Sequence, residues 1–553
     1  MRSGRSAQVL EKRLISSPIG RTCPIALGVF AVAGGPCESR ACGEPAADGA
    51  AREKGGRKGG KSMFRRLFLL IALTAGVFAF TGIISAAVGP LTLSSGPSPF
   101  ATCTIGGPGT INVNAEVEPF LAVDPTNASH MIGVFQQDRW DNGGAHGLVA
   151  AITQNGGASW TPTWAHFSLC SGGTVANGGD FERASDPWVT FAPNGDAYQI
   201  ALTLNGNDFA TGVLVSKLPH GSNTWSEPVT LARDTSPFAS HDKESITADP
   251  TNSNYVYAVW DRARKPGENN SLNAGHSFAF RGDLMFSRTT DSGATWSAPR
   301  NLLPTNANLF TSGNIVAVLP NGTLVDVFEF AKGSGTQRSP NQFSESVVRS
   351  TDKGLTWSPI IDISTDQSIG VRDPDTGAPV RTGAGLPDVA VAPDGTLYVV
   401  WADSRFSGGV RDDIALSKST DGGLTWSTPI KVNQTPVPVA AFTPAVDVAG
   451  NGTVAVTYYD FRNNTPDPNT LPTDYWIVYS TDDGATWGGE QRITTPTSFD
   501  LDTAPVAPAS RGHFVGDYEG LAHSSNTFLP FFARANTGDT ANRTDIFFTS
   551  ATP

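Results

Sequence analysis

This chain has few charged residues and few cysteines. Asp, Glu, Lys and Arg account for 16% of its 553 residues, and there are five cysteines. Heptad repeats and long amphipathic stretches are also missing, which argues against a coiled coil or a helical bundle. The chain has no Gly-x-Ser-x-Gly, His-Glu-x-x-His, Cys-x-x-Cys or P-loop motif. The chemistry that depends on those motifs is therefore not indicated.

Glycine, proline and tryptophan are abundant instead. There are 59 Gly, 39 Pro and 12 Trp. Short runs of alternating apolar and polar residues lie between clusters of Gly, Asn, Asp and Pro, as antiparallel strands joined by tight turns require. This composition predicts an all-β protein with many turns.

An eight-residue turn with the pattern Ser/Thr-x-Asp-x-Gly-x-Thr-Trp recurs along the chain. Its Asp and hydroxyl groups can hydrogen-bond the backbone of a tight turn, Gly supplies the left-handed conformation, and Trp covers one side of the hairpin. Two degenerate copies end at Trp160 and Trp225. Four full copies follow them: Thr289–Trp296, Ser350–Trp357, Ser419–Trp426 and Ser480–Trp487.

This turn resembles the Asp-box, or BNR repeat, of sialidase-type β-propellers. The resemblance implies a single β-propeller of four-stranded antiparallel blades. The Asp-box is a structural motif, so it names no reaction by itself.

A second type of turn recurs between pairs of strand-like runs, and its occurrences give the number of repeats. One unit reads as four strands, 387–391, 397–401, 413–417 and 430–432. Seven such units favour seven blades, and six blades, as in familiar sialidases, are the alternative. The counting turns are 124–127, 192–195, 249–252, 319–322, 392–395, 449–452 and, weakly, 523–526.

The last unit, near 517–549, lacks an Asp-box and a fourth strand. A closed ring cannot leave that strand edge open. Residues Thr110–Asn114 look like the missing strand, so we expect an N-terminal strand to close the propeller, which then spans 110–553.

The N-terminal region differs in character from the rest. Residues 63–87 combine a basic start, an apolar run and small residues at the end, which indicates a signal peptide, or an uncleaved membrane anchor. Residues 1–62 are interpreted as a mis-assigned or disordered extension, and 88–109 as a linker. The protein is therefore expected to be secreted, or anchored to a membrane.

Charge and cysteine usage also change after residue 87. Residues 1–87 contain 13 of the 39 Lys and Arg and 5 of the 51 Asp and Glu, which leaves 26 basic and 46 acidic residues, a net charge of −20. Such an acidic surface argues against nucleic acid and anionic membranes as partners. Cys103 and Cys170 remain, and an exported chain with one pair predicts an intrachain disulfide, with two free buried thiols as the alternative.

The starts of the first strands should surround the central funnel. Glu118, Asp186 and Lys243 each lie seven residues before the Pro of a counting turn, and Asp517 holds the same place in the last unit. Carboxylates in such a ring suit glycoside hydrolysis, which needs a proton donor and a second group at the oxocarbenium-like centre.

Asp–Arg pairs recur where second strands end, at 138–139, 261–262, 403–405 and 460–462, with Arg534 alone in the last unit. They are interpreted either as ligand contacts on the binding face or as structural locks between blades.

The sialidase resemblance assigns roles to particular residues. Sialidases use a Tyr of the last blade as nucleophile, and Tyr518 is similarly placed. Neighbouring strand residues face opposite ways, so Asp186, Glu244 or Asp388, rather than Glu519, would accept its proton. The catalytic candidates are Tyr518, Glu519, Asp517, Asp141, Asp186 and Glu244, and the substrate-binding candidates are Arg139, Arg183, Arg262, Arg405, Arg462 and Arg534; Arg381 and Arg511 are further clamp candidates.

One departure bears on substrate. Sialidases open their first blade with an Arg that holds the substrate carboxylate, and Glu118 stands in that place here. The sequence therefore leaves three functions open: a sialidase-like glycoside hydrolase acting on extracellular glycans, a non-catalytic propeller that binds glycans or proteins, and a non-sialidase glycosidase or lyase. A monomer without metal or cofactor is expected, and Arg372–Gly377 is interpreted as an Asp-rich turn, with a Ca²⁺ loop as the alternative.

Overall fold

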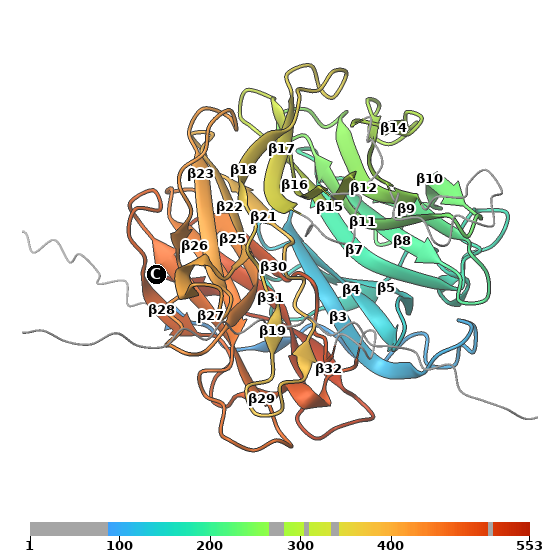
Figure 1. Cartoon of the computed structure of the whole chain (residues 1–553). Helices are drawn as coiled ribbons and strands as arrows, with labels where there is room; N and C mark the ends of the chain where they lie inside the picture. The colour runs from blue at the N-terminus through green and yellow to red at the C-terminus, as the bar shows by residue number, and fades with distance from the viewer. Residues whose placement is uncertain (1–86, 265–280, 304–308, 333–341, 507–511) are drawn as a thin grey trace, which may run out of the picture. The chain divides into compact units, whose positions relative to one another are not determined.

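The computed structural model describes residues 87–553, apart from 265–280, 304–308, 333–341 and 507–511. The predicted extension at 1–62 and nearly all of the predicted signal peptide at 63–87 lie outside the described residues. The described chain is built of strands, with 3-10 turns η1 (Leu169–Ser171), η3 (Arg405–Ser407) and η4 (Leu501–Thr503) (Figure 1). The all-β prediction is confirmed. Within the described ranges, no helix has the length and apolar character to cross a membrane.

One repeating unit shows how the strands pair. β21 (Asp388–Val391), β22 (Leu397–Asp403), β23 (Asp413–Ser419) and β24 (Ile430–Lys431) form an antiparallel sheet in chain order. Both faces of β22 are buried. Leu397, Val399 and Trp401 share an apolar cluster with β16 (Leu324–Lys332), and Tyr398 and Val400 share another with β25 (Ala441–Val448). The four strands predicted for this unit are confirmed.

The same antiparallel order occurs in the other runs of strands. These are β3 (Ile111–Val123), β4 (Met131–Trp140), β5 (Ala145–Thr153) and β6 (Thr161–Thr163); β7 (Arg183–Phe191), β8 (Ala197–Leu204), β9 (Thr211–Leu218) and β10 (Val229–Asp234); β11 (Ala239–Ala248), β12 (Val256–Arg264), β13 (Arg281–Thr289) and β14 (Arg300–Asn301); β15 (Leu309–Val318), β16 (Leu324–Lys332), β17 (Gln342–Ser350) and β18 (Ile361–Thr365); β25 (Ala441–Val448), β26 (Val454–Asp460), β27 (Pro472–Ser480) and β28 (Gly488–Arg492); and β30 (Gly520–Ser524), β31 (Thr527–Ala535) and β32 (Thr544–Phe548).

The short strands outside these runs are β1 (Ala87–Val88), β2 (Thr92–Leu93), β19 (Val371–Arg372), β20 (Pro379–Val380), β29 (Phe499–Asp500) and β33 (Ala551–Thr552).

The apolar core lies between consecutive sheets. Val134 and Leu148, for example, share one buried cluster with Val189 and Leu214 of the following sheet. Each sheet therefore buries side chains against both neighbours.

The Asp-box turns have the expected local structure. In the copy at Ser419–Trp426, the Asp421 carboxylate accepts hydrogen bonds from the Thr425 backbone at 2.9 Å and from its hydroxyl at 2.5 Å. The Ser419 hydroxyl accepts one from the Gly423 N–H at 2.8 Å, and Gly423 has a φ of +85°. Trp426 packs against the apolar cluster of β16 and β22. The turn thus satisfies its own polar groups and contributes its Trp to the core.

The segment predicted to close the propeller pairs with a different neighbour. Ile111 and Asn112 pair with Trp140 and Arg139 of β4, so the Thr110–Asn114 segment begins the long first strand. β2, within the segment interpreted as a linker, instead pairs with β32 through Thr92 and Leu93. The prediction failed because a short Asn-containing strand fits either place by sequence, whereas β32 meets β3 at one position alone, Ala115 opposite Thr544.

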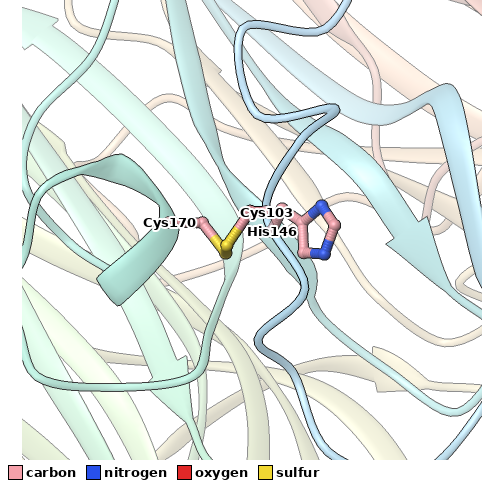
Figure 2. A group of neighbouring side chains, drawn as sticks. All are labelled: Cys103, His146 and Cys170. Atoms are coloured by element: carbon pink, nitrogen blue, oxygen red, sulfur yellow. A yellow bond between two sulfur atoms is a disulfide. The ribbon is translucent and has the colours of Figure 1, made fainter.

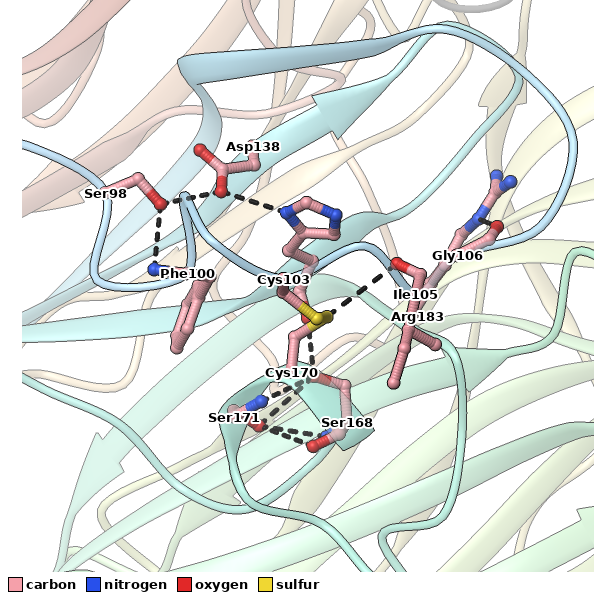
Figure 3. Close-up of a disulfide and its surroundings, with 11 residues drawn as sticks. Ser98, Phe100, Cys103, Ile105, Gly106, Asp138, Ser168, Cys170, Ser171 and Arg183 are labelled. Carbon is pink, nitrogen blue, oxygen red and sulfur yellow. Dashed lines mark hydrogen bonds and ion pairs between the residues drawn. A yellow bond between two sulfur atoms is a disulfide. The ribbon is translucent and has the colours of Figure 1, made fainter.

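Cys103 and Cys170 lie at bonding distance, with sulfurs 2.03 Å and Cα atoms 5.7 Å apart (Figure 2). The N-terminal segment on either side of Cys103 is also held by other contacts. Phe100 is buried, and the Arg183 guanidinium donates to the Gly106 carbonyl at 2.5 Å (Figure 3). It also donates to the Pro108 carbonyl at 2.7 Å. The cross-link therefore ties a docked segment to the first repeat.

We expect loss of the Cys103–Cys170 cross-link to destabilise the protein. It closes a loop of 67 residues, for which the unfolded-chain entropy corresponds to about 4 kcal/mol. Urea unfolding of the Cys103→Ser, Cys170→Ser double variant should show this loss relative to oxidised wild type, and should match wild type under reductant. Two free thiols titrated in denatured, non-reduced wild type would contradict the expectation.

Candidate active-site cleft

A buried lysine gathers three carboxylates from different sheets. Lys243 Nζ lies 2.6 Å from Asp517, 3.1 Å from Asp186 and 3.7 Å from Glu118. All four residues were predicted to meet from their spacing to the counting turns, and the structure brings them together. We call these four residues the central cluster.

Strand irregularities place these side chains. The first strands lose register between 117 and 120, between 185 and 188 and between 242 and 245. At those points Glu118, Asp186 and Lys243 have φ values of +55°, +49° and +50°. A bulge re-aims a side chain, and left-handed backbone at non-glycine residues is uncommon and gathers at functional sites.

The three acids of the central cluster differ in pKa. Burial acts to raise the pKa of Asp517, yet the charges of Lys243 and Arg381 hold it far below its usual range. The pKa of Asp186 is also lowered, since the charge of Lys243 outweighs its burial. Burial and the charge of Asp186 raise the pKa of Glu118 to about 8 despite Lys243. At neutral pH the cluster therefore holds two carboxylates and one protonated carboxyl.

Arg381 completes the coordination of Asp517. Its Nε donates to Asp517 at 2.9 Å, and a terminal nitrogen donates to the other carboxylate oxygen. Arg139 and Arg381 both lie over the Phe514 ring, at 5.1 and 4.3 Å from its centre. Arg381 thus binds the Asp517 carboxylate at two points, in the way that an arginine would bind the carboxylate of an acidic sugar.

The Tyr518 hydroxyl is hydrogen-bonded to the backbone in the described part of the chain. The hydroxyl donates to the backbone carbonyl of Pro187 at 3.1 Å. Burial and the charges of Glu118, Asp186 and Glu244 raise the pKa of Tyr518 well above its ordinary value. The hydroxyl thus directs its hydrogen bond to a backbone carbonyl 331 residues away in the chain, and among the described residues no hydrogen bond joins it to Asp186, Glu244 or Asp388.

Two of the neighbouring acids accept backbone hydrogen bonds, and the third is buried. Glu519 accepts the Ala533 N–H at 2.9 Å, and burial raises its pKa well above the usual range. Asp388 accepts the Val446 N–H at 2.8 Å, and burial raises its pKa to about 7. Glu244 is buried, with a pKa raised by burial and by Asp186. The opposite facing predicted for Tyr518 and Glu519 is consistent with these contacts.

Most predicted arginines have local partners. Arg405 binds Asp403 at 2.9 and 2.7 Å, Arg262 binds Asp234 at 2.7 and 3.1 Å, and Arg462 binds Asp460 at 2.7 Å and also Glu490. Arg183 holds backbone carbonyls. Arg405 and Arg462 thus bind the Asp of their own predicted pair, whereas Arg262 binds Asp234.

Two further candidates, Asp141 and Arg534, contact residues outside the central cluster. The Asp141 carboxylate accepts the Thr110 N–H at 2.9 Å, and the Arg534 guanidinium lies 5.7 Å from the centre of the Phe547 ring. Arg511 is outside the described residues. Asp261 accepts bonds from Thr311 and Asn314 of the next sheet at 2.6 and 2.7 Å, so this acid locks two sheets together.

A cleft of about 500 Å³ opens beside the central cluster. Lys243, Arg381 and Asp517 form part of its lining, together with Asp242 and Glu329. Burial, with the charge of nearby Asp366, raises the pKa of Glu329 to about 8. Asp242 is exposed and accepts the Lys243 N–H at 3.1 Å. Two carboxyl groups from β11 and β16 thus face one solvent-filled hollow.

Sequence reasoning missed Glu329. It lies in the second strand of a repeat that lacks the Asp–Arg pair, within Val325–Phe330, where Asp326 and Glu329 stand among apolar residues. An acid among apolar strand residues is a signal that could have identified it, because such a group is costly to bury without a purpose.

The described residues contain one group with the spacing of a metal site, namely Cys103, His146 and Cys170 (Figure 2). The two sulfurs are bonded to each other, and His146 Nδ1 lies 3.0 Å from the Asp138 carboxylate. As oxidised, these residues do not offer a thiolate pair to an ion. The Arg372–Gly377 segment is an Asp-rich turn in which Asp373 accepts the Asp375 N–H at 2.8 Å.

The comparison with protein-family models identifies the repeat. A family model described as a BNR repeat-like domain matches residues 206–487, which include all four full turns. A protein of unknown function from Dyadobacter fermentans is 12% identical, with a TM-score of 0.43 and coverage of 85% of this chain and 100% of that chain. A Penicillium chrysogenum alpha-L-arabinanase complexed with arabinobiose is 11% identical, with a TM-score of 0.42 and coverage of 84% and 98%. A Hadza microbial sialidase is 14% identical, with a TM-score of 0.42 and coverage of 85% and 96%. No curated protein matches the sequence.

Proposed function

The chain belongs to the BNR repeat-like family, and from that premise we propose that it is a secreted glycoside hydrolase that cleaves extracellular glycans at a sugar without a carboxylate. The observation that carries the proposal is the pair of carboxyl groups, Glu329 and Asp242, that line one cleft. Glycoside hydrolysis needs one protonated carboxyl and one carboxylate on either side of the scissile bond.

The two groups have environments suited to those roles. Glu329, with its pKa near 8, is protonated at neutral pH and donates a proton to the departing oxygen. Asp242 is the exposed acid and carries the negative charge that stabilises the oxocarbenium-like centre or activates water. The surroundings of Asp242 in the cleft disfavour its charged form and, with the charges of Asp186 and Asp517, raise its pKa, whereas the charge of Lys243 lowers it.

The cations of the cleft favour a neutral sugar. Lys243 and Arg381 both bind Asp517, and Arg372 donates to the Gly377 carbonyl at 3.0 Å. Within the described lining, a sialic acid carboxylate would therefore have to displace Asp517. This argues against the sialidase-like activity that the sequence resemblance implies, and with it against a Tyr518 nucleophile.

The non-catalytic alternative is favoured by the same saturated cluster, because ion pairs across the centre of a ring can serve structure alone. One assay separates the two functions: purified residues 88–553 on a panel of fluorogenic glycosides, sialosides included. We expect turnover of a neutral glycoside and none of a sialoside. Glycan binding without any turnover would establish the binding propeller instead.

We also propose that the protein is a monomeric seven-bladed propeller closed by its N-terminal segment. The first strands touch in succession, from β3 through β7, β11, β15, β21, β25 and β30, and β30 touches β3 again. β2 would serve as the outer strand beside β32.

Closure predicts the effect of a short N-terminal deletion. Removing residues 88–95 takes away β1, β2 and the packing of Val88 and Leu91 against the core, a loss of about 3 kcal/mol, and exposes the edge of β32 to aggregation. Leu93→Ser, at a half-exposed position of the same strand, serves as the control with the backbone pairing intact. Unchanged thermal stability of the deletion variant would remove the closure proposal.

A further inference from the structure

A second hollow of about 690 Å³ adjoins the central cleft. The two share four consecutive lining residues, Ile369, Gly370, Val371 and Arg372. One backbone segment therefore separates them, and a ligand that passes over it reaches both. Each volume lies in the range of a small-molecule site, about 300–1,000 Å³.

The wall between the hollows is built firmly. β19 and β20 pair through Val371 with Val380 and Arg372 with Pro379. The Asp373 side chain closes the turn between them, and Gly377 donates to the Asp373 carbonyl at 2.9 Å. Asn464, from the loop after β26, donates to Asp375 at 2.8 Å. The hairpin is thus held to the opposite side of the second hollow.

Exposed apolar side chains gather at this hollow. Ile369 and Val410 line it with exposures of 54% and 75%, and Val437, next to the lining residue Pro438, is 74% exposed. Large apolar side chains that cluster at an exposed hollow indicate a binding surface. Arg372, Asn464 and the backbone of Gly370 add polar groups to the same lining.

We propose that a glycan chain runs from the central cleft over Gly370–Arg372 into the second hollow, so that the substrate is an oligosaccharide or polysaccharide. The inference rests on the proposed function, since it assigns the reacting sugar to the central cleft. Sugar rings present C–H faces that pack on Val410 and Val439, and hydroxyls that bond to Arg372 and Asn464. A protein segment is disfavoured because the lining alternates polar and apolar groups within a short span.

The test compares kcat/KM on a neutral oligosaccharide with kcat/KM on the matching aryl monosaccharide. Val410→Asp puts a charge on an exposed position of the second hollow. The ratio of kcat/KM on the oligosaccharide to kcat/KM on the monosaccharide should then fall about tenfold. Val410→Leu should restore the ratio. Leu424→Asp, at a 52% exposed apolar residue of an Asp-box turn, is the matched control and should leave the ratio unchanged.

An unchanged ratio in Val410→Asp would overturn the inference while leaving the proposed function intact. If no glycoside is turned over, the proposed function fails, and the same variants are tested by calorimetric titration with the oligosaccharide. Binding that weakens about tenfold in Val410→Asp alone would then support the second hollow as a glycan site. Equal binding in all variants, or no binding by wild type, would overturn it.

Discussion

Replacing Lys243 by methionine is expected to destabilise the protein by about 3–5 kcal/mol at neutral pH, because removal of one partner leaves buried charges uncompensated. Lys243 lies within 4 Å of all three carboxyl groups, those of Glu118, Asp186 and Asp517, and its side chain is 12% exposed. The measurement is urea unfolding followed by tryptophan fluorescence.

The control is Lys217→Met. Lys217 binds Asp196 at 2.8 Å, but its side chain is 26% exposed and it meets a single carboxylate. A pair of that kind contributes below about 1 kcal/mol. Equal losses in the two variants would show that the central cluster has no special energetic role.

The loss should depend on pH in a defined direction. Asp186 and Asp517 have lowered pKa values in the folded protein, so their stabilisation is complete above about pH 4 and is lost as pH falls through the folded values. In Lys243→Met no ammonium group stabilises the carboxylates of Asp186 and Asp517, so their pKa values rise and they are protonated at higher pH. The gap between wild type and variant should therefore narrow on acidification, and a gap that widens would contradict the charge assignment.

Substitution of Glu329 by glutamine should reduce turnover of a neutral glycoside by about 10²–10⁴, the usual contribution of a general acid. The amide keeps the shape of the side chain but cannot donate the carboxyl proton. Folding should be preserved, since Glu329 is already protonated at neutral pH. Asp362→Asn, an exposed acid of β18 paired with Lys332 at 3.4 Å, is the matched control with wild-type activity expected. Retention of full activity in Glu329→Gln would assign the proton donor elsewhere.

The local repeats made much of this structure predictable. The Asp-box fixes its turn through its own hydrogen bonds, as Asp421 does, and the counting turn fixes a register. That register was enough to place Glu118, Asp186, Lys243 and Asp517 together, because equivalent positions of repeated sheets meet at one end of the first strands.

The parts that failed depend on contacts between distant segments. Thr110–Asn114 and Thr92–Leu93 are both short and β-compatible, and the sheet edge beside β32 decides between them. The hydroxyl of Tyr518 meets the Pro187 carbonyl because two repeats approach each other there. Glu329 becomes a site residue through the cleft it lines with Asp242 and Arg381, and no spacing in the chain encodes that cleft.

The pH dependence of kcat/KM on a neutral fluorogenic glycoside tests the central claim most directly. The free enzyme must hold Glu329 protonated, so kcat/KM should stay high through neutral pH and fall about tenfold per unit above pH 8. That alkaline limb should be absent from the residual activity of Glu329→Gln. A sialoside-only enzyme, or a neutral glycosidase whose rate rises through pH 8, would contradict the account.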